Sequence, residues 1–148
     1  MRKLSSHFAL LFTFRKTIEN LQYLCHSNTN VKMKEAIIHA GPKVEIIDSP
    51  IPKAQPGQVV IKVAVSGSNP KDWKVPEWLP DTPPCNQGDD IAGTVHEVGE
   101  GVTEFRKGDR VAAFHEMLKP HGSYAEYAVA WAHTTFFLPQ KTSFEGKL

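Results

Sequence analysis

Cysteine is scarce in this sequence of 148 residues, in which Cys25 and Cys85 are the only two. They lie in regions of different character and no spacing pairs them, so the sequence is not that of a disulfide-stabilised scaffold. Asn-x-Ser/Thr acceptors for N-linked glycans are absent as well. Both absences favour a reducing intracellular compartment, and we expect a cytoplasmic protein.

Glycine and proline are absent from the first 40 residues, since all ten glycines and all eleven prolines lie at or after Gly41. Up to residue 32 there is also only one acid, Glu19, among basic and hydroxyl side chains. This composition is similar to that of an organelle presequence, although an extension ahead of a functional start at Met33 explains it equally well. We therefore expect an extension or presequence at 1–32 and a folded domain at 33–148. A presequence would make the location mitochondrial.

Strong charge of either sign and long apolar runs are missing too. The net charge is +1, of which residues 1–32 contribute +4 and the remaining residues −3. A weakly acidic domain is poorly suited to neutralising phosphates, so we expect no nucleic-acid partner. Hydrophobic residues make up 41% of the chain and charged residues 22%, which is ordinary for a globular protein. We expect no membrane partner either.

Short apolar segments separated by glycine and proline groups fill the chain after Met33. They predict strands at Glu35–His39, Val44–Ile47, Val59–Val65, Ile91–Val98, Arg110–Ala113, Ser123–Val129 and Thr134–Leu138. Many short strands with such turns favour a mainly β barrel or sandwich, and closing the sheet would remove exposed edges. Helix is expected only around Lys71–Trp78 and in the amino-terminal segment.

One predicted strand ends in an unusual polar step, "SGSNPKDWK", which covers residues 66–74. The strand before it alternates, so that one face carries Val59, Ile61, Val63 and Val65. Loops at strand ends often carry catalytic or binding groups, because the scaffold fixes the loop while its polar atoms stay available. The segment after this strand is therefore a candidate site.

Four segments in a fixed order connect this step to a known family. They are "NPKDWK" at 69–74, "GDDIAGTVHEVGEGV" at 88–102, "FRKGDRV" at 105–111 and "GSYAEYAV" at 122–129. In this order they resemble the amino-terminal, GroES-like domain of the medium-chain dehydrogenase/reductase superfamily. Within it they are most similar to the zinc-independent quinone oxidoreductases and trans-acting enoyl reductases. The resemblance implies a GroES-like, partly open β-barrel with few short helices and NADPH-dependent reduction of a small enoyl or quinone substrate.

The positions of the zinc ligands in related alcohol dehydrogenases can be compared directly. Asn69 stands where the zinc enzymes have a cysteine, and Asp89 stands where they have the histidine of a Gly-His-Glu motif. No cysteine follows Cys85, so the four-cysteine structural zinc lobe is absent as well. His115 and His121 match no standard spacing, and we expect them to be solvated or hydrogen-bonded. The sequence therefore predicts no metal site.

Without a metal, hydrogen-bond donors must polarise the substrate and geometry must position the nicotinamide. Asn69 offers a donor and an acceptor, and Pro70 fixes the backbone that aims it. Lys74 can offer a cation to a cofactor phosphate or a proton to the developing enolate. By resemblance, the Asn-Pro-x-Asp-Trp-Lys segment faces the nucleotide domain, which makes Asn69 and Lys74 candidate catalytic residues. The same resemblance makes Asn69, Pro70, Asp72 and Lys74 candidate cofactor contacts.

The other notable residues near these motifs are expected to have structural roles. Trp73 is expected to anchor the core. The adjacent carboxylates Asp89 and Asp90 should point to opposite faces, with one of them capping a turn or binding backbone amides. Gly93 predicts a bulge or a close backbone approach. The Gly99-x-Gly101 step is interpreted as a hairpin turn, because Glu104 replaces the third glycine of a dinucleotide fingerprint and no helix follows.

The carboxyl-terminal "FFLPQKTSFEGKL" ends where the family chain would enter the helix leading to its Rossmann domain, and no complete Gly-x-Gly-x-x-Gly occurs. We therefore expect a partial oxidoreductase, with these residues alone lacking activity. Two alternatives stay open. One is a non-catalytic GroES-like β-barrel for binding or oligomerisation. The other is an inactive truncated gene product whose exposed apolar surface promotes self-association.

Overall fold

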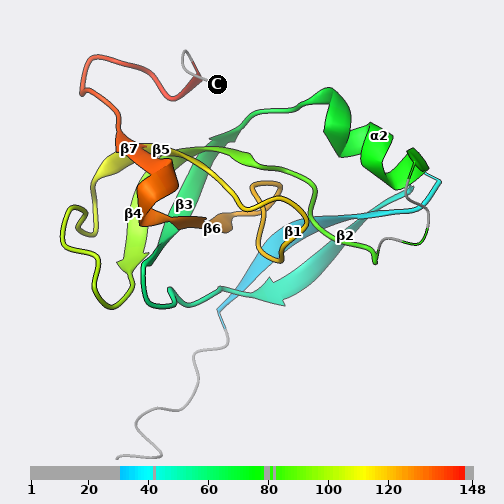
Figure 1. Ribbon diagram of the computed structural model, residues 1–148, viewed down its shortest axis with the longest axis horizontal. Coiled ribbons are helices and arrows are strands. Elements are labelled where there is room, and N and C mark those ends of the chain that lie inside the picture. Colours follow the sequence, from blue (N-terminus) through cyan, green and yellow to red (C-terminus); the bar gives the residue numbers. More distant parts are fainter. Residues whose placement is uncertain (1–30, 42, 79–80, 82, 146–148) are drawn as a thin grey trace, which may run out of the picture. The chain divides into compact units, whose positions relative to one another are not determined.

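The computed structural model describes residues 31–41, 43–78, 81 and 83–145, which form two antiparallel sheets and one α-helix (Figure 1). The smaller sheet is a ribbon of β1 (Lys32–His39) and β2 (Lys43–Pro50). The larger sheet has the strand order β6-β3-β4-β5-β7. Its strands are β3 (Gln58–Ser66), β4 (Asp90–Val98), β5 (Arg110–Phe114), β6 (Tyr127–Trp131) and β7 (Thr135–Phe137). The helix α2 (Pro70–Trp78) follows β3, and a short 3-10 helix, η1 (Ala132–Thr134), precedes β7.

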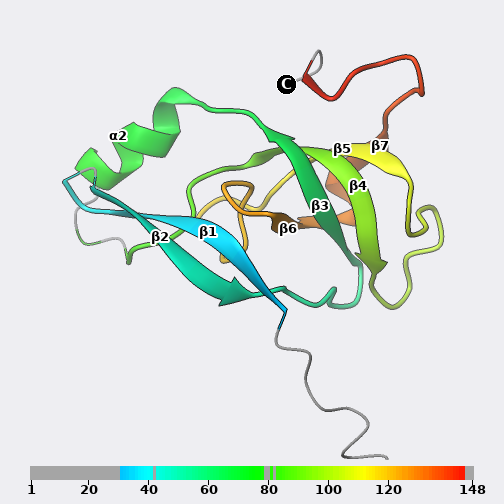
Figure 2. The ribbon, with the colours of Figure 1, turned by 180° about the vertical axis from the view of Figure 1, so that it is seen from behind.

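The larger sheet is curled, as the two opposite views show (Figures 1 and 2). Its strands contribute most of the main hydrophobic core. Small and β-branched side chains fill this core, which suits strands that pack closely across a curved sheet. The buried residues are Val59, Ile61, Ile91, Val95, Phe105, Val111, Ala113, Ala128, Ala130 and Ala132. The expected mainly β, partly open barrel with little helix is confirmed.

The pairing of β3 with β4 is interrupted by two irregularities, between Val60 and Ile61 and between Val63 and Val65. Gly93 lies at the second one, where a Cβ atom would come within 2.1 Å of the Lys62 carbonyl oxygen, so the expected close approach is confirmed. The expectation that alternate valines share one face to the end of β3 is wrong. Val65 packs against a second small cluster, because the bulge reverses the alternation.

The strand predicted at Ser123–Val129 forms only at its end, since β6 begins at Tyr127. The residues before it cross over to other elements instead. Ser123 N donates to the Gly88 carbonyl, and Glu126 N donates to the Lys34 carbonyl. This detour brings the segment ahead of β6 against β1 and against the loop that enters β4. The extension predicted at 1–32, and the helix expected in it, fall almost wholly outside the described residues.

Candidate functional site

The site is built where β3 ends and α2 begins. Asn69 precedes the helix and Pro70 is its first residue, a position where the missing N–H of proline costs nothing. Asp72 Oδ2 accepts the backbone N–H of Asn69 at 2.7 Å. This bond is half of a capping box, in which the third helical residue satisfies the donor that precedes the helix. The local sequence therefore fixes the direction in which α2 leaves the sheet.

The side chain of Asn69 reaches across to β4 instead of capping its own helix. Its Nδ2 donates to Asp90 Oδ2 at 2.6 Å. Gly67 permits this approach, because a Cβ atom there would lie 2.9 Å from the Asp90 Cβ. This hydrogen bond thus joins the segment that follows β3 to the start of β4.

Tyr124 joins the network from the segment ahead of β6. Its hydroxyl donates to Asp72 Oδ2 at 2.6 Å. Burial raises the pKa of Tyr124 well above its usual range, and the hydrogen bond to Asp72 raises it further. Tyr124 therefore stays neutral and holds the first turn of α2 against the loop.

Lys71 connects the helix to the entrance of β4. Its Nζ lies 2.9 Å from Asp72 Oδ1 and 2.7 Å from Asp89 Oδ2, and it also donates to the Gln87 carbonyl. Burial would lower the pKa of Lys71, but the bonds to Asp89 and Asp72 outweigh burial and raise it. Lys71 is therefore charged and forms ion pairs with the carboxylates of both Asp72 and Asp89.

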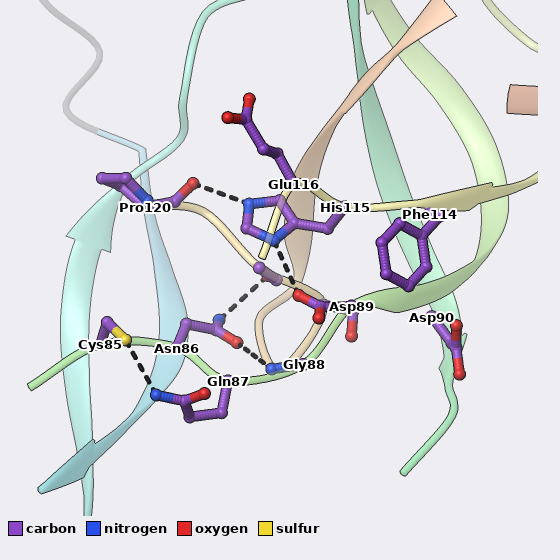
Figure 3. A network of polar contacts seen from close by, with 12 residues as sticks. Cys85, Asn86, Gln87, Gly88, Asp89, Asp90, Phe114, His115, Glu116 and Pro120 are labelled. Carbon is purple, nitrogen blue, oxygen red and sulfur yellow. Dashed lines mark hydrogen bonds and ion pairs between the residues drawn. The ribbon is translucent and has the colours of Figure 1, made fainter. Parts of the chain in front are cut away.

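Asp89 faces a histidine on its other side, as the close-up in Figure 3 shows. Asp89 Oδ1 lies 3.1 Å from His115 Nδ1, and His115 Nε2 lies 3.0 Å from the Pro120 carbonyl oxygen. Both side chains are almost completely buried, at 1% and 2% exposure. His115 is therefore held on both ring nitrogens, by the Asp89 carboxylate on one side and by the Pro120 carbonyl on the other.

These contacts correct one expectation and confirm another. Asp89 and Asp90 do point to different partners, as predicted. However, the prediction that one of them binds backbone amides or caps a turn is wrong, because both carboxylates bind side chains. The partners are residues far away in the sequence, which strand periodicity does not reveal. His115 is hydrogen-bonded, as expected.

Asn86 holds the loop ahead of β4 in place and is itself buried (Figure 3). Its Oδ1 accepts the backbone N–H groups of Gly88 and Tyr124, both at 3.1 Å, and its Nδ2 donates to the Gly122 carbonyl at 2.9 Å. Gly88 and Gly122 leave no room for a Cβ atom, which would lie within 2.5 Å of neighbouring oxygens. This crossing of two loops positions Tyr124 next to α2.

A pocket of about 410 Å³ opens above this network. Its lining is Ile38, Ser68, Asn69, Pro70, Asp72, Trp73 and Tyr124. The pocket brings together three of the predicted site residues, Asn69, Pro70 and Asp72. Lys74 is not in the lining. Its Nζ lies 5.2 Å from the ring centroid of Trp73 and 5.5 Å from that of Trp78, within reach of cation–π attraction.

Trp73 was expected to anchor the core, and this prediction is wrong. Its side chain is 51% exposed and lines the pocket. The polar network occupies the inner side of the first helical turn, so the indole faces outward. The sequence did not indicate Tyr124 or Lys71 as residues of this network, although Tyr124 lies in the "GSYAEYAV" segment and Lys71 in "NPKDWK".

The fold can now be compared with known proteins. A family profile for the alcohol dehydrogenase GroES-like domain matches residues 55–140, which is more than half of the chain. The chain belongs to this family. The match covers the end of β3, α2 and the loops that build the pocket, so the predicted GroES-like domain of the medium-chain dehydrogenase/reductase superfamily is confirmed.

Relatives of this GroES-like domain include enoyl and quinone reductases. The chain is 64% identical over 113 residues to Trans-enoyl reductase fsr4 of Gibberella fujikuroi, a match that covers 76% of this chain and 33% of that protein. It is 41% identical over 116 residues to the quinone oxidoreductase of Sus scrofa, covering 71% and 32%. The chain spans about a third of the length of these curated relatives.

Solved structures of the family share the fold. The quinone oxidoreductase of Coxiella burnetii superposes with a TM-score of 0.69 at 29% identity, covering 76% of this chain and 39% of that one. An alcohol dehydrogenase superfamily protein from Novosphingobium aromaticivorans gives 0.68 at 30% identity, covering 76% and 36%. In both cases the superposition covers less than half of the longer protein, so the match is to one part of it.

Zinc, which some alcohol dehydrogenases bind, does not fit the donors gathered here. The amide of Asn69 donates one N–H to Asp90, and the two oxygens of Asp89 face Lys71 and His115. A metal cation at Asp89 would displace or repel the Lys71 ammonium. In the part of the chain that the structure describes, no group of three or more His, Cys, Asp or Glu side chains is arranged to hold a metal ion.

Among the described residues, no helix has the length and hydropathy needed to cross a membrane.

Proposed function

We propose that the native protein carrying this domain is a zinc-independent oxidoreductase that uses NADPH to reduce an enoyl substrate. The pocket at the end of β3 carries the proposal, because it gathers Asn69, Pro70 and Asp72 beside the Tyr124 hydroxyl. Identity of 64% to a trans-enoyl reductase, against 41% to a quinone oxidoreductase, favours the enoyl substrate. A quinone is the alternative substrate class.

Asn69 polarises the substrate oxygen in this proposal. An asparagine amide has two N–H donors, and Asp90 accepts one of them. The second donor serves the substrate, and the bond to Asp90 keeps the amide from rotating. Preorganised donors of this kind stabilise negative charge that develops on oxygen. Pro70 and Asp72 fix the turn that aims Asn69, and their contact with the cofactor stays a prediction.

Lys74 supplies the positive charge of the site. NADPH, when bound, supplies the hydride. Lys74 then holds a cofactor phosphate or gives a proton to the enolate. The ammonium lies over Trp73, whose indole lines the pocket, so it is next to the pocket without being one of its walls. A small movement of this long side chain brings the charge to a bound ligand.

The direct test is NADPH consumption by the native protein, isolated from its source and identified by its intact mass. We expect NADPH to be consumed with a crotonyl thioester, more slowly with benzoquinone, and the same sample to contain no stoichiometric zinc. A native protein that consumes no NADPH with either acceptor would contradict the proposal. One zinc per chain by elemental analysis would overturn the metal-free mechanism.

Lys74→Ala tests the role of the lysine. Hydrogen bonds to charged groups contribute about 1.5–3 kcal/mol, so we expect a loss of roughly tenfold to a hundredfold in kcat/KM. A raised KM for NADPH would identify the phosphate role, and a lowered kcat the proton-donor role. Lys107→Ala, in an exposed turn, is the matched control. Unchanged kinetics in Lys74→Ala would make Lys74 a surface residue.

A further inference from the structure

The outward face of the β1–β2 ribbon is unexpectedly apolar. Residues paired directly across the two strands share a face. On this face Ile38 pairs with Val44, Ala36 with Ile46, and Lys34 with Asp48. The 2.7 Å ion pair between Lys34 and Asp48 agrees with this register.

Solvent reaches this face, and the opposite one is packed inward only in part. The side chains of Met33, Glu35 and Ser49 on the other face are buried. In contrast, Val44 is 57% exposed and Ile46 is 64% exposed. Antiparallel strands with one solvated face normally place polar residues there, so these two side chains need another explanation.

The apolar face is continuous with the pocket. Ile38 lines the pocket together with Trp73 and Tyr124, and Val44 lies directly opposite Ile38. Figures 1 and 2 both show the turn between β1 and β2 next to α2, with the ribbon running away from the helix. A ligand that leaves the pocket past Ile38 therefore moves onto Val44 and then onto Ile46.

We propose that Ile38, Val44, Ala36 and Ile46 form an acyl track, which binds the unbranched hydrocarbon chain of the substrate while its reactive end occupies the pocket. This inference rests on the proposed function, because it identifies which enoyl substrates the site takes. It assigns specificity for long chains to a surface that lies outside the polar site.

The dimensions of the track favour a single extended chain. Its width is one cross-strand pair, with Cβ atoms about 4.5–5.5 Å apart. From Ile38 to Lys34 the strand advances four residues, or about 13 Å. The Lys34–Asp48 ion pair closes the far end with charge, so hydrocarbon gains nothing beyond it. A quinone ring would instead be held within the pocket alone.

Chain length should control affinity. A fully buried methylene strengthens binding roughly fourfold, and about twofold when half of its surface stays in water. We therefore expect the Kd to fall about twofold to fourfold for each methylene, until the chain reaches the ion pair, and then to level off.

Saturated acyl thioesters of N-acetylcysteamine test this without cofactor or turnover. The butanoyl to dodecanoyl series is titrated into the native protein, below micelle-forming concentrations, and Kd is measured by calorimetry. Ile46→Ser should leave the butanoyl Kd unchanged and abolish the gain from longer chains. Val44→Thr, which keeps the side-chain shape, should reduce the gain. Phe136→Ser, at a similarly exposed residue of β7, is the control.

Three results would overturn the acyl track. The first is a Kd independent of chain length, and the second is an unchanged chain-length dependence in Ile46→Ser. The third is a lower native mass for Ile46→Ser on a sizing column with the dependence intact, which would mean that a second copy covers this face. Failure of the proposed function is separate, because it appears as absent NADPH consumption while the chain-length dependence persists.

Discussion

Asp89 is the residue on which the buried charges of the domain converge. It pairs with Lys71 on one side and His115 on the other, and both contacts come from segments distant in sequence. The sequence indicated Asp89 as a replaced zinc ligand and as one of two carboxylates, one of which is expected to cap a turn or bind backbone amides. Its partners could not be predicted, because they depend on how the loops cross and not on any local pattern. The bond between Asn69 N–H and Asp72 is local in sequence, although the sequence analysis gave both residues only as candidate site residues.

Asp89→Asn tests how much Asp89 contributes to the free energy of unfolding. The change removes the carboxylate charge that pairs with the Lys71 ammonium in a nearly water-free position, and losing one partner of a buried ion pair costs about 3–5 kcal/mol. We expect a lower free energy of unfolding by about this amount in urea titrations. Asp48→Asn, in the exposed pair with Lys34, should change nothing measurable. Equal stability of the two variants would show that the Asp89 contacts add little.

The helix α2 is held at one end by its own cap and on its inner side by Tyr124 and Lys71. The helix expected around Lys71–Trp78 agrees within one residue with the observed Pro70–Trp78. Periodicity was less informative for β6, whose first predicted residues pair with β1 and the loop ahead of β4. The sequence also predicted the wrong side of the helix for Trp73. An aromatic residue is expected to face the core, but here the inner side of the helix is polar and Trp73 is 51% exposed.

The contacts of Tyr124 and Lys71 that hold α2 in place predict a loss of stability in alkaline solution. The pKa values of Tyr124 and Lys71 are both raised in the folded protein from ordinary values of 10.0 and 10.5. The folded state therefore keeps protons that the unfolded chain releases above pH 10.0, and stability falls as pH rises through this range. We expect the Tm to decline above that pH, and less steeply in Tyr124→Phe. Parallel declines in both proteins would exclude a contribution from Tyr124.

At the scale of the whole molecule, the GroES-like barrel has a pocket where β3 ends and α2 begins. Ordered motifs predicted this family where no single motif could, because their spacing reflects the loops that meet at the pocket. Exposed apolar side chains beside that pocket were not predictable, since alternation alone does not say which face of an isolated ribbon is covered. Self-association and a cytoplasmic or mitochondrial location stay predictions, testable by sizing and by localisation of the native protein.

Hydrogen exchange in the native protein, with and without NADPH and a saturated acyl thioester, tests the central claim most directly. The claim is that the end of β3 and the start of α2 form the site of reduction. We predict slower amide exchange in residues 67–78 and around Tyr124 when both ligands are present. Unchanged exchange in these segments, with protection confined to other parts of the protein, would contradict it.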